Sequence, residues 1–413
     1  MKLPYKLQVF VLSFAIICVF EMLMIQDYKF LSMPIDYSTP SYSILWTFII
    51  SLLPLTFLDV KESKHCKSIS SWIFFVFFYF SICVVGRYYL ADLPNYLTFT
   101  LSICSCLYLY NFTLKLRIPG IVFNLSKAYT ASKRFFPLIT LLIAIGYIYV
   151  IISFRPSFNL NDLYIYDLRS NARFLDQSFS AYAQSPFRIV IPSFLIFFGI
   201  TYKKYYYFIV VAISSITLFF IDGTKSSLLI PFILCYFYFL CNKSKPHIWL
   251  LVSFFFLIII SLLFFSIPSL ENNLVTTLIS ERLLIVPGGL SALTWSYLPD
   301  ISDPARLSYE VGKYFYQIDT TQLVINANSN LFLTGFAYAG LFGGLIVALM
   351  AGTFTLIIFS TSRLISPVLS IYLTCVSMFT WAEQAFHTSL LSSALIFLII
   401  YPIYFYSIKT KSL

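Results

Sequence analysis

Apolar runs of about 20 residues recur along the whole 413-residue chain, and this pattern constrains the fold more than any other feature. A helix of about 20 residues crosses a hydrocarbon core of roughly 30 Å. Charged residues make up only 11% of the chain, against about 25% in an ordinary soluble domain. Because a backbone in lipid must satisfy its own hydrogen bonds, the sequence predicts an all-α polytopic membrane protein.

The apolar runs divide into about twelve expected membrane spans. They cover residues 7–25, 42–58, 71–90, 96–112, 136–154, 187–202, 205–221, 226–241, 248–267, 337–359, 366–381 and 390–406. The last two come from dividing one apolar stretch, 366–406, which is too long for a single helix. The short pairs around 203–204 and 222–226 could instead be re-entrant segments, so the number of spans stays open by about two.

Lysine and arginine are distributed unevenly between the connecting segments. With the N-terminus inside and the spans alternating, the inner side receives 17 basic residues and 2 acids, and the outer side receives 10 basic residues and 15 acids. The positive-inside rule therefore predicts that both termini are cytoplasmic. The same rule accounts for the net charge of +10, so we expect no nucleic-acid partner.

We expect one integral membrane domain over residues 1–413, with two long outer segments at about 155–186 and 268–336. Lys2 and Lys6 precede the first apolar run, which we interpret as an uncleaved helix because no small-x-small cleavage site follows. The eight cysteines form no CxxC pair and show no metal-ligand spacing, so neither a disulfide framework nor a zinc site is expected. The absence of an internal repeat argues against transporters built from repeated halves.

The first outer segment contains a pair of arginines, Arg169 and Arg173, spaced four residues apart. On a helix they would share one face. Two guanidinium groups that point the same way form an anion site suited to a diphosphate, because each offers a planar fork of donors. The alternative is an ordinary solvated face paired with Asp167 or Asp176.

A glycine turn at residues 222–227 contains Lys225 and several hydroxyl groups, at the expected start of a helix. This composition suits an oxyanion site, although a tight turn with a helix cap would have the same composition. The spacing of a nucleotide-binding Walker loop is absent, so ATP is not indicated.

The second outer segment begins with Arg282 beside Glu281 and closes with Asn328 and Asn330 just before the next span. The amide groups could bind sugar hydroxyls, or Asn330 could simply cap the helix. Gly335, Gly340, Gly343 and Gly344 follow, and small residues there favour close helix packing.

Glu383, His387 and Arg87 are ionisable residues that lie within or at the ends of apolar runs. Glu383 and His387 are one helical turn apart, and His387 has a side chain suited to proton transfer near neutral pH. Ionisable groups at membrane depth favour a functional role, but this turn could also simply reach water. Arg87 lies near the outer end of its span, where it could extend to the headgroups or bind a lipid diphosphate.

Several of these segments together resemble the Wzy family of O-antigen polymerases, which join oligosaccharide repeat units. The resemblance covers about residues 150–400 and rests on the following positions: Tyr166 to Arg169, Gly223 to Ser226, Arg282 to Gly288, Asn328 to Asn330, Gly335, Tyr338, Gly340, Gly343, Gly344, and His387 to Leu391. Each motif is weak, and only their combination and order are specific.

The resemblance implies a GT-C-like membrane glycosyltransferase in the bacterial inner membrane, with two large periplasmic loops. It implies that undecaprenyl-diphosphate-linked glycans are the substrates, that membrane lipids surround the protein and that a chain-length co-polymerase is a partner. No nucleotide sugar, cofactor or metal is expected. Some members carry an Arg-x10-Gly pattern in both loops, which neither 155–186 nor 268–336 shows, so the choice of catalytic arginine stays open.

A diphosphate leaving group without a metal requires cationic side chains to stabilise its developing charge. We expect Arg282 and Arg169 to do so, with Glu383 or His387 as the base. Asp167, Asp222 and Glu281 are other candidates for the base. The expected substrate-binding residues are Arg173, Lys225, Asn328, Asn330 and Tyr338.

Other functions remain as alternatives. An O-antigen ligase shares the chemistry but typically carries a histidine in its large loop, and residues 268–336 contain none. A lipid-linked oligosaccharide flippase usually has short loops throughout. A receptor or assembly scaffold is opposed only by the basic clusters, and a membrane acyltransferase would need more than His387.

Overall fold

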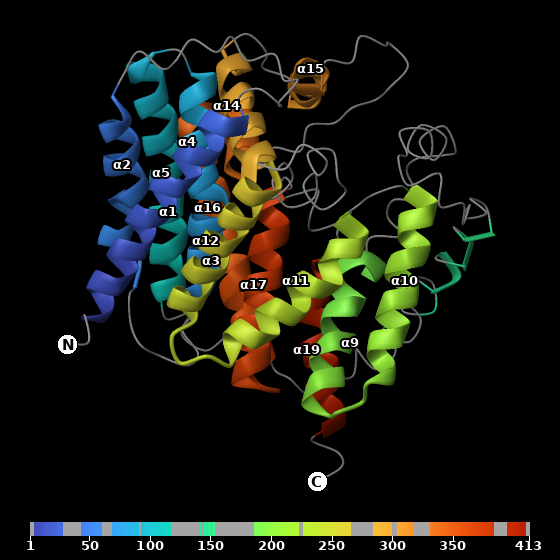
Figure 1. Ribbon diagram of the computed structural model, residues 1–413. Coiled ribbons are helices and arrows are strands. Elements are labelled where there is room, and N and C mark those ends of the chain that lie inside the picture. Colours follow the sequence, from blue (N-terminus) through green and yellow to red (C-terminus); the bar gives the residue numbers. More distant parts are fainter. Residues whose placement is uncertain are drawn as a thin grey trace. The chain divides into compact units, whose positions relative to one another are not determined.

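The computed structural model describes residues 4–27, 43–59, 68–90, 92–116, parts of 141–152, 186–222, 226–265, 284–299, 304–316, 331–383 and 395–409. The regular elements in these ranges are all helical, which confirms the predicted all-α class (Figure 1). The expected span at 136–154 lies mostly outside the described residues.

Five of the described helices are long and apolar enough to cross a membrane. They are Tyr5–Met24, Ile69–Tyr89, Leu93–Lys115, Pro246–Phe264 and Leu331–Arg363. Shorter apolar helices cover Ile44–Thr56, Pro186–Thr201, Tyr206–Phe220, Ser227–Cys241 and Pro367–Trp381. These positions match expected spans, whereas the number twelve, the GT-C-like architecture and the sidedness stay predictions.

The contacts of the chain divide it into two compact units, which we describe separately. Unit 1 comprises Met1–Leu116, Lys243–Phe354 and Trp381–Phe386. Unit 2 comprises Arg117–Asn242, Thr355–Thr380 and His387–Leu413. Two compact units can belong to one membrane domain, so the single domain expected over 1–413 stays a prediction.

Unit 1 is built around one continuous helical segment, Ile69–Tyr89, which joins α3 (Ile69–Phe74), a π-helical turn η2 (Phe75–Tyr79) and α4 (Phe80–Tyr89). The whole apolar window of this segment is buried. Its neighbours in unit 1 include α1 (Tyr5–Asp27), α2 (Ile44–Leu52), α5 (Leu93–Lys115) and α12 (Pro246–Phe265). A helix that is apolar on all sides and fully covered lies in the core of a bundle.

The surrounding helices of unit 1 expose apolar side chains. Examples are Phe10 and Phe14 in α1, Phe112 in α5, and Phe256 and Leu263 in α12. A soluble protein rarely leaves such large side chains uncovered over several adjoining helices. Their exposure therefore fits helices that face lipid.

Two helices, α14 (Val286–Tyr297) and α15 (Pro304–Tyr316), belong to the segment that the sequence placed outside, 268–336. Val286, Leu290 and Leu293 of α14 pack with Leu307 and Val311 of α15 in a buried cluster. The apolar face of α15 thus covers α14, and α14 in turn packs along α4. The described part of this segment is therefore a folded layer of unit 1.

The long helix α16 (Leu331–Arg363) is sharply bent, because Ala339 and Gly340 have non-helical backbone angles. Gly340 adopts φ +58°, a conformation that favours glycine. The bend brings Gly335 against Gly343, so closely that a Cβ on Gly335 would lie 2.5 Å from the carbonyl oxygen of Gly343. The expected close packing is therefore confirmed for Gly335, Gly343 and Gly344, whereas a Cβ on Gly340 would meet no atom within 4 Å.

Unit 2 contains η4 (Pro186–Val190), α9 (Ile191–Thr201), α10 (Tyr206–Asp222), α11 (Ser226–Cys241), most of α17 (Pro367–Glu383) and α19 (Phe397–Lys409). Aromatic rings join these helices. The ring of Phe197 in α9 lies 5.6 Å from that of Tyr238 in α11 and 5.8 Å from that of Tyr372 in α17. Phe194 and Tyr401 make a similar contact between α9 and α19, at 5.2 Å.

Candidate functional site

Most of the residues that the sequence singled out lie outside the described residues. These are Arg169, Arg173, Lys225, Arg282, Asn328, Asn330 and His387. Tyr338 is described in the first part of α16 and is 64% exposed, so it is accessible to a ligand. Glu383 is the last residue of α17. The assigned roles therefore stay predictions, but the described residues that follow Arg282 and Asn330 in sequence are informative.

The chain after Arg282 enters the interior of unit 1. Leu284 and Ile285 are fully buried, and the hydroxyl of Ser81 in α4 donates a hydrogen bond to the carbonyl oxygen of Leu284. The same hydroxyl accepts a hydrogen bond from the backbone N–H of Gly288 at 3.0 Å. Ser81 therefore holds the start of α14 against the central segment Ile69–Tyr89.

Gly288 permits this contact because it has no side chain. A Cβ at this position would lie 2.7 Å from the carbonyl carbon of Ser81, closer than real Cβ atoms approach. Pro287 precedes it at the second position of the helix, where a missing N–H is tolerated. The sequence Pro287-Gly288 thus suits a helix that begins directly against another backbone.

From this junction α14 runs along α4 toward the start of α5. A Cβ on Gly86 of α4 would contact Ala292 at 3.7 Å. Farther along, the indole N–H of Trp295 donates to the Oδ1 atom of Asn95 at 2.8 Å. A helix of 12 residues is about 18 Å long, so α14 accompanies only part of the central segment.

The first arm of α16, Leu331–Tyr338, is arranged similarly. Leu331 and Phe332 are fully buried, and the ring of Phe332 lies 5.0 Å from that of Phe74 in α3. The ring of Phe336 then lies 5.5 Å from that of Trp295. Two motifs of the resemblance, one ending at Gly288 and the other at Asn330, thus lead directly into helices that begin inside unit 1.

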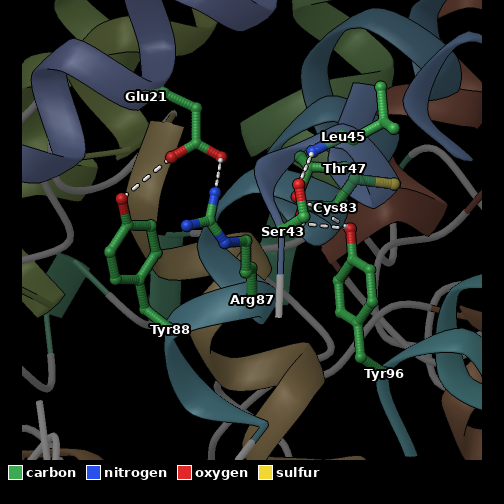
Figure 2. Close-up of polar contacts among 8 residues, drawn as sticks. All are labelled: Glu21, Ser43, Leu45, Thr47, Cys83, Arg87, Tyr88 and Tyr96. Carbon is green, nitrogen blue, oxygen red and sulfur yellow. Dashed lines mark hydrogen bonds and ion pairs between the residues drawn. The ribbon is translucent and has the colours of Figure 1, made fainter. Parts of the chain in front are cut away.

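A buried ionic cluster lies at the C-terminal end of α4 (Figure 2). Arg87 Nη1 pairs with Glu21 Oε1 of α1 at 3.1 Å, and the hydroxyl of Tyr88 donates to Glu21 Oε2 at 2.8 Å. The two charged side chains are only 11% and 4% exposed. The sequence left open whether Arg87 extends to the headgroups or binds a lipid diphosphate. In the structure its guanidinium group forms an ion pair with Glu21. Ionisable groups in an apolar bundle favour a functional role.

A second set of polar contacts joins α2, α4 and α5 (Figure 2). The hydroxyl of Tyr96 donates to the carbonyl oxygen of Cys83 at 3.0 Å and lies 3.5 Å from the hydroxyl oxygen of Thr47. Hydrogen bonds between apolar helices fix their register, because few other polar partners exist there. These contacts stabilise the helix layer that carries Arg87.

Sequence reasoning missed two residues of this region. Glu21 carried a usable signal, because it is an acid inside the first apolar run. Ser81 carried none, since a lone serine in an apolar helix usually bonds to its own backbone. Within the described ranges no group of three or more His, Cys, Asp or Glu side chains could hold a metal ion.

No protein-family model, curated protein or solved structure matches the chain.

Proposed function

We propose that the protein polymerises undecaprenyl-diphosphate-linked oligosaccharide repeat units into O-antigen polysaccharide at the periplasmic face of the bacterial inner membrane. The observation that carries the proposal is the position of α14 and of the first arm of α16. Both helices begin beside the central segment Ile69–Tyr89. The helix α14 begins within the motif that contains Arg282, and α16 begins directly after the motif that contains Asn330.

This arrangement suits a substrate whose reactive group is held at a membrane surface. The diphosphate of a polyprenyl carrier stays near the ends of the spans, while the sugars extend into water. A cation that must reach the diphosphate is therefore best placed on a segment that enters the bundle. Arg282 precedes Leu284 by two residues, and Leu284 is bonded to Ser81, so the proposal assigns Arg282 to this junction.

The proposed reaction transfers the growing chain from its carrier to the next repeat unit. The bond between the anomeric carbon and the diphosphate breaks, and a new glycosidic bond forms to an acceptor hydroxyl. Arg282 and Arg169 stabilise the charge on the leaving diphosphate, assisted by Arg173 and Lys225. The acceptor proton passes to Glu383 or His387.

The sugars themselves require neutral donors and acceptors. Asn328 and Asn330 are assigned to the acceptor hydroxyls through their amide groups. Tyr338, which is exposed on the first arm of α16, is the described residue of this group. It offers both a ring face and a hydroxyl to a sugar.

An O-antigen ligase is the nearest alternative, and a flippase is a more distant one. The lack of histidine in residues 268–336 favours the polymerase over the ligase. The folded layer of α14 and α15 opposes a flippase with short connections. Both alternatives predict a different glycan pattern on deletion of the gene.

The test is a lipopolysaccharide gel from cells that lack the gene. A collapse of the ladder to core plus one repeat unit supports the polymerase, and loss of all O-antigen supports a ligase or flippase. An unchanged ladder rejects the assignment.

Complementation of the deletion strain then tests the assigned role of Arg282. Arg282→Ala should fail to restore the ladder, whereas Arg306→Ala, which changes an exposed arginine of α15, should restore it. Immunoblots of the membrane fraction must show equal amounts of both variants. Restoration of the ladder by Arg282→Ala would remove Arg282 from the site.

A further inference from the structure

The turn between α9 and α10 concentrates tyrosine and lysine at one exposed place. We call residues 202–206 the α9–α10 tip. The tip contains Tyr202, Lys203, Lys204, Tyr205 and Tyr206, and all five are exposed. No acidic residue occurs between Asp176 and Asp222 in the sequence, so no carboxylate flanks the tip along the chain.

The backbone of the tip forms a complete helix-ending motif. The N–H of Lys203 bonds to the carbonyl oxygen of Ile200 at 3.3 Å, and the N–H of Lys204 bonds to that of Gly199 at 2.9 Å. These two bonds define a Schellman ending, in which the residue after the cap adopts a left-handed conformation. The tip is thus a fixed turn whose side chains project from a defined backbone.

Lys203 occupies the left-handed position, with φ +56°, where glycine is the usual residue. It is the one non-glycine residue with positive φ in the ranges that the structure describes. Any side chain beyond glycine strains the backbone at such a position, and strain of this kind is often retained where the side chain has a function. The positive charge is the property that glycine could not supply.

The exposed surface changes in a regular order along α10. Ile209, Ile213 and Ile216 are exposed and lie on one face of the helix. Tyr206 and Tyr205, which are also exposed, follow within the tip itself. The two lysines lie beyond them. This order of aliphatic, tyrosine and lysine side chains matches the order of bilayer core, interface and headgroup layer.

The length of α10 supports this correspondence. Its 17 residues span about 25 Å, which is shorter than a hydrocarbon core of roughly 30 Å. Short apolar helices reach the surface through flanking side chains that extend to the headgroups. Lysines at the tip can place their ammonium groups at the depth of the lipid phosphates.

We propose that the α9–α10 tip binds the headgroups of anionic phospholipids. Lys203 and Lys204 contact the phosphates, while Tyr202, Tyr205 and Tyr206 lie in the interfacial layer. Neither lysine forms an ion pair within the described part of the chain, so both charges are available. This lipid surface is independent of the polymerase proposal.

The test measures lipid bound to the purified full-length protein in a neutral detergent, by native mass spectrometry. Wild type should retain phosphatidylglycerol in preference to phosphatidylcholine. Removal of each lysine should weaken phosphatidylglycerol binding about fivefold. Increased salt should weaken it further, because exposed charges are screened.

Two variants separate the effect of the positive charge on lipid binding from an effect on folding. Lys203→Gly removes the charge but suits the left-handed backbone, so thermal stability without lipid should stay equal or rise while lipid binding falls. Lys203→Arg with Lys204→Arg should keep the binding. Lys115→Gln, a half-exposed lysine of unit 1 paired with Asp59, is the matched control and should bind lipid as wild type does.

The decisive variant combines Lys203→Gly with Lys204→Gln. Loss of the preference for phosphatidylglycerol in this variant, with the control unchanged, supports the tip as the binding surface. If the variant is folded and retains phosphatidylglycerol as strongly as wild type, the proposal is wrong. An equal loss in Lys115→Gln would also overturn it, because the effect would then reflect net charge.

Discussion

Gly288 of α14 and Ser81 of α4 are 207 positions apart in sequence, yet the backbone N–H of Gly288 donates to the Ser81 hydroxyl at 3.0 Å. That hydroxyl in turn donates to the carbonyl oxygen of Leu284. One side chain therefore satisfies two backbone groups at the start of α14. The position of the segment after Arg282 depends on this junction, so substitutions here should affect stability and, under the proposed function, chain extension.

Gly288→Ala should destabilise the protein by about 1–3 kcal/mol, because the new methyl group overlaps the backbone of Ser81. Thermal unfolding in detergent measures the change. Gly86→Ala is the matched control, since its Cβ would lie 3.3 Å from the ring of Phe99 and would not overlap a backbone. Equal stability of Gly288→Ala and wild type would contradict the close contact.

Ser81→Ala should cost about 1–3 kcal/mol, because it leaves the buried N–H of Gly288 and the carbonyl oxygen of Leu284 without this partner. Under the proposed function, the O-antigen ladder should also shorten, because the start of α14 is released. Ser105→Ala is the control, because Ser105 is exposed and bonds only to Leu101 of its own helix. A normal ladder and unchanged unfolding in Ser81→Ala would count against the junction.

Single substitutions in the Glu21–Arg87 pair should be severe. Glu21→Leu or Arg87→Leu leaves one buried charge without its ionic partner, at a cost of about 3–5 kcal/mol. The double variant should recover much of this loss, because no charge then remains buried. The free energies of unfolding of the four proteins form a double-mutant cycle. Additive losses in the double variant would show that the two charges are not coupled.

The bend of α16 can be tested by comparing two glycines. Gly343→Ala places a methyl group against the backbone of Gly335, whereas Gly340→Ala meets no atom within 4 Å and suffers only from its φ of +58°. We expect about 1–3 kcal/mol of destabilisation for Gly340→Ala, because its backbone angles suit only glycine. Gly343→Ala should lower the free energy of unfolding by a larger amount. The reverse order in unfolding experiments would mean that the arms are not packed through these glycines.

The helices themselves could be predicted from the sequence. The apolar runs that become α1, α5 and α12 are long enough to exclude other elements, because lipid and apolar cores both require a satisfied backbone. What the runs could not indicate is which helix is central. The 18-residue apolar window of Ile69–Tyr89 is fully buried, whereas the window of Pro246–Phe264, which is even more hydropathic, is only 33% buried. Apolar side chains suit lipid and protein interior equally well, so composition does not separate the two.

The candidate site was less predictable. The sequence placed Pro287 and Gly288 in an outer segment, and only the contact of Gly288 with Ser81 shows that a buried helix begins there. A contact between positions so far apart leaves no local pattern. The partner of Arg87 was missed for a different reason: Glu21 was visible as an acid in an apolar run, but nothing in the sequence indicates that α1 and α4 meet there.

The bend in α16 also changes how the crossings of the chain should be counted. A straight helix of 33 residues would be about 50 Å long, but the first arm has only eight residues and a length of about 12 Å. An arm of that length cannot traverse a core of roughly 30 Å. Leu331–Arg363 can therefore contribute at most one crossing, which the arm after Gly340 would make. Reporter fusions just before Leu331 and just after Tyr338 should report the same side of the membrane.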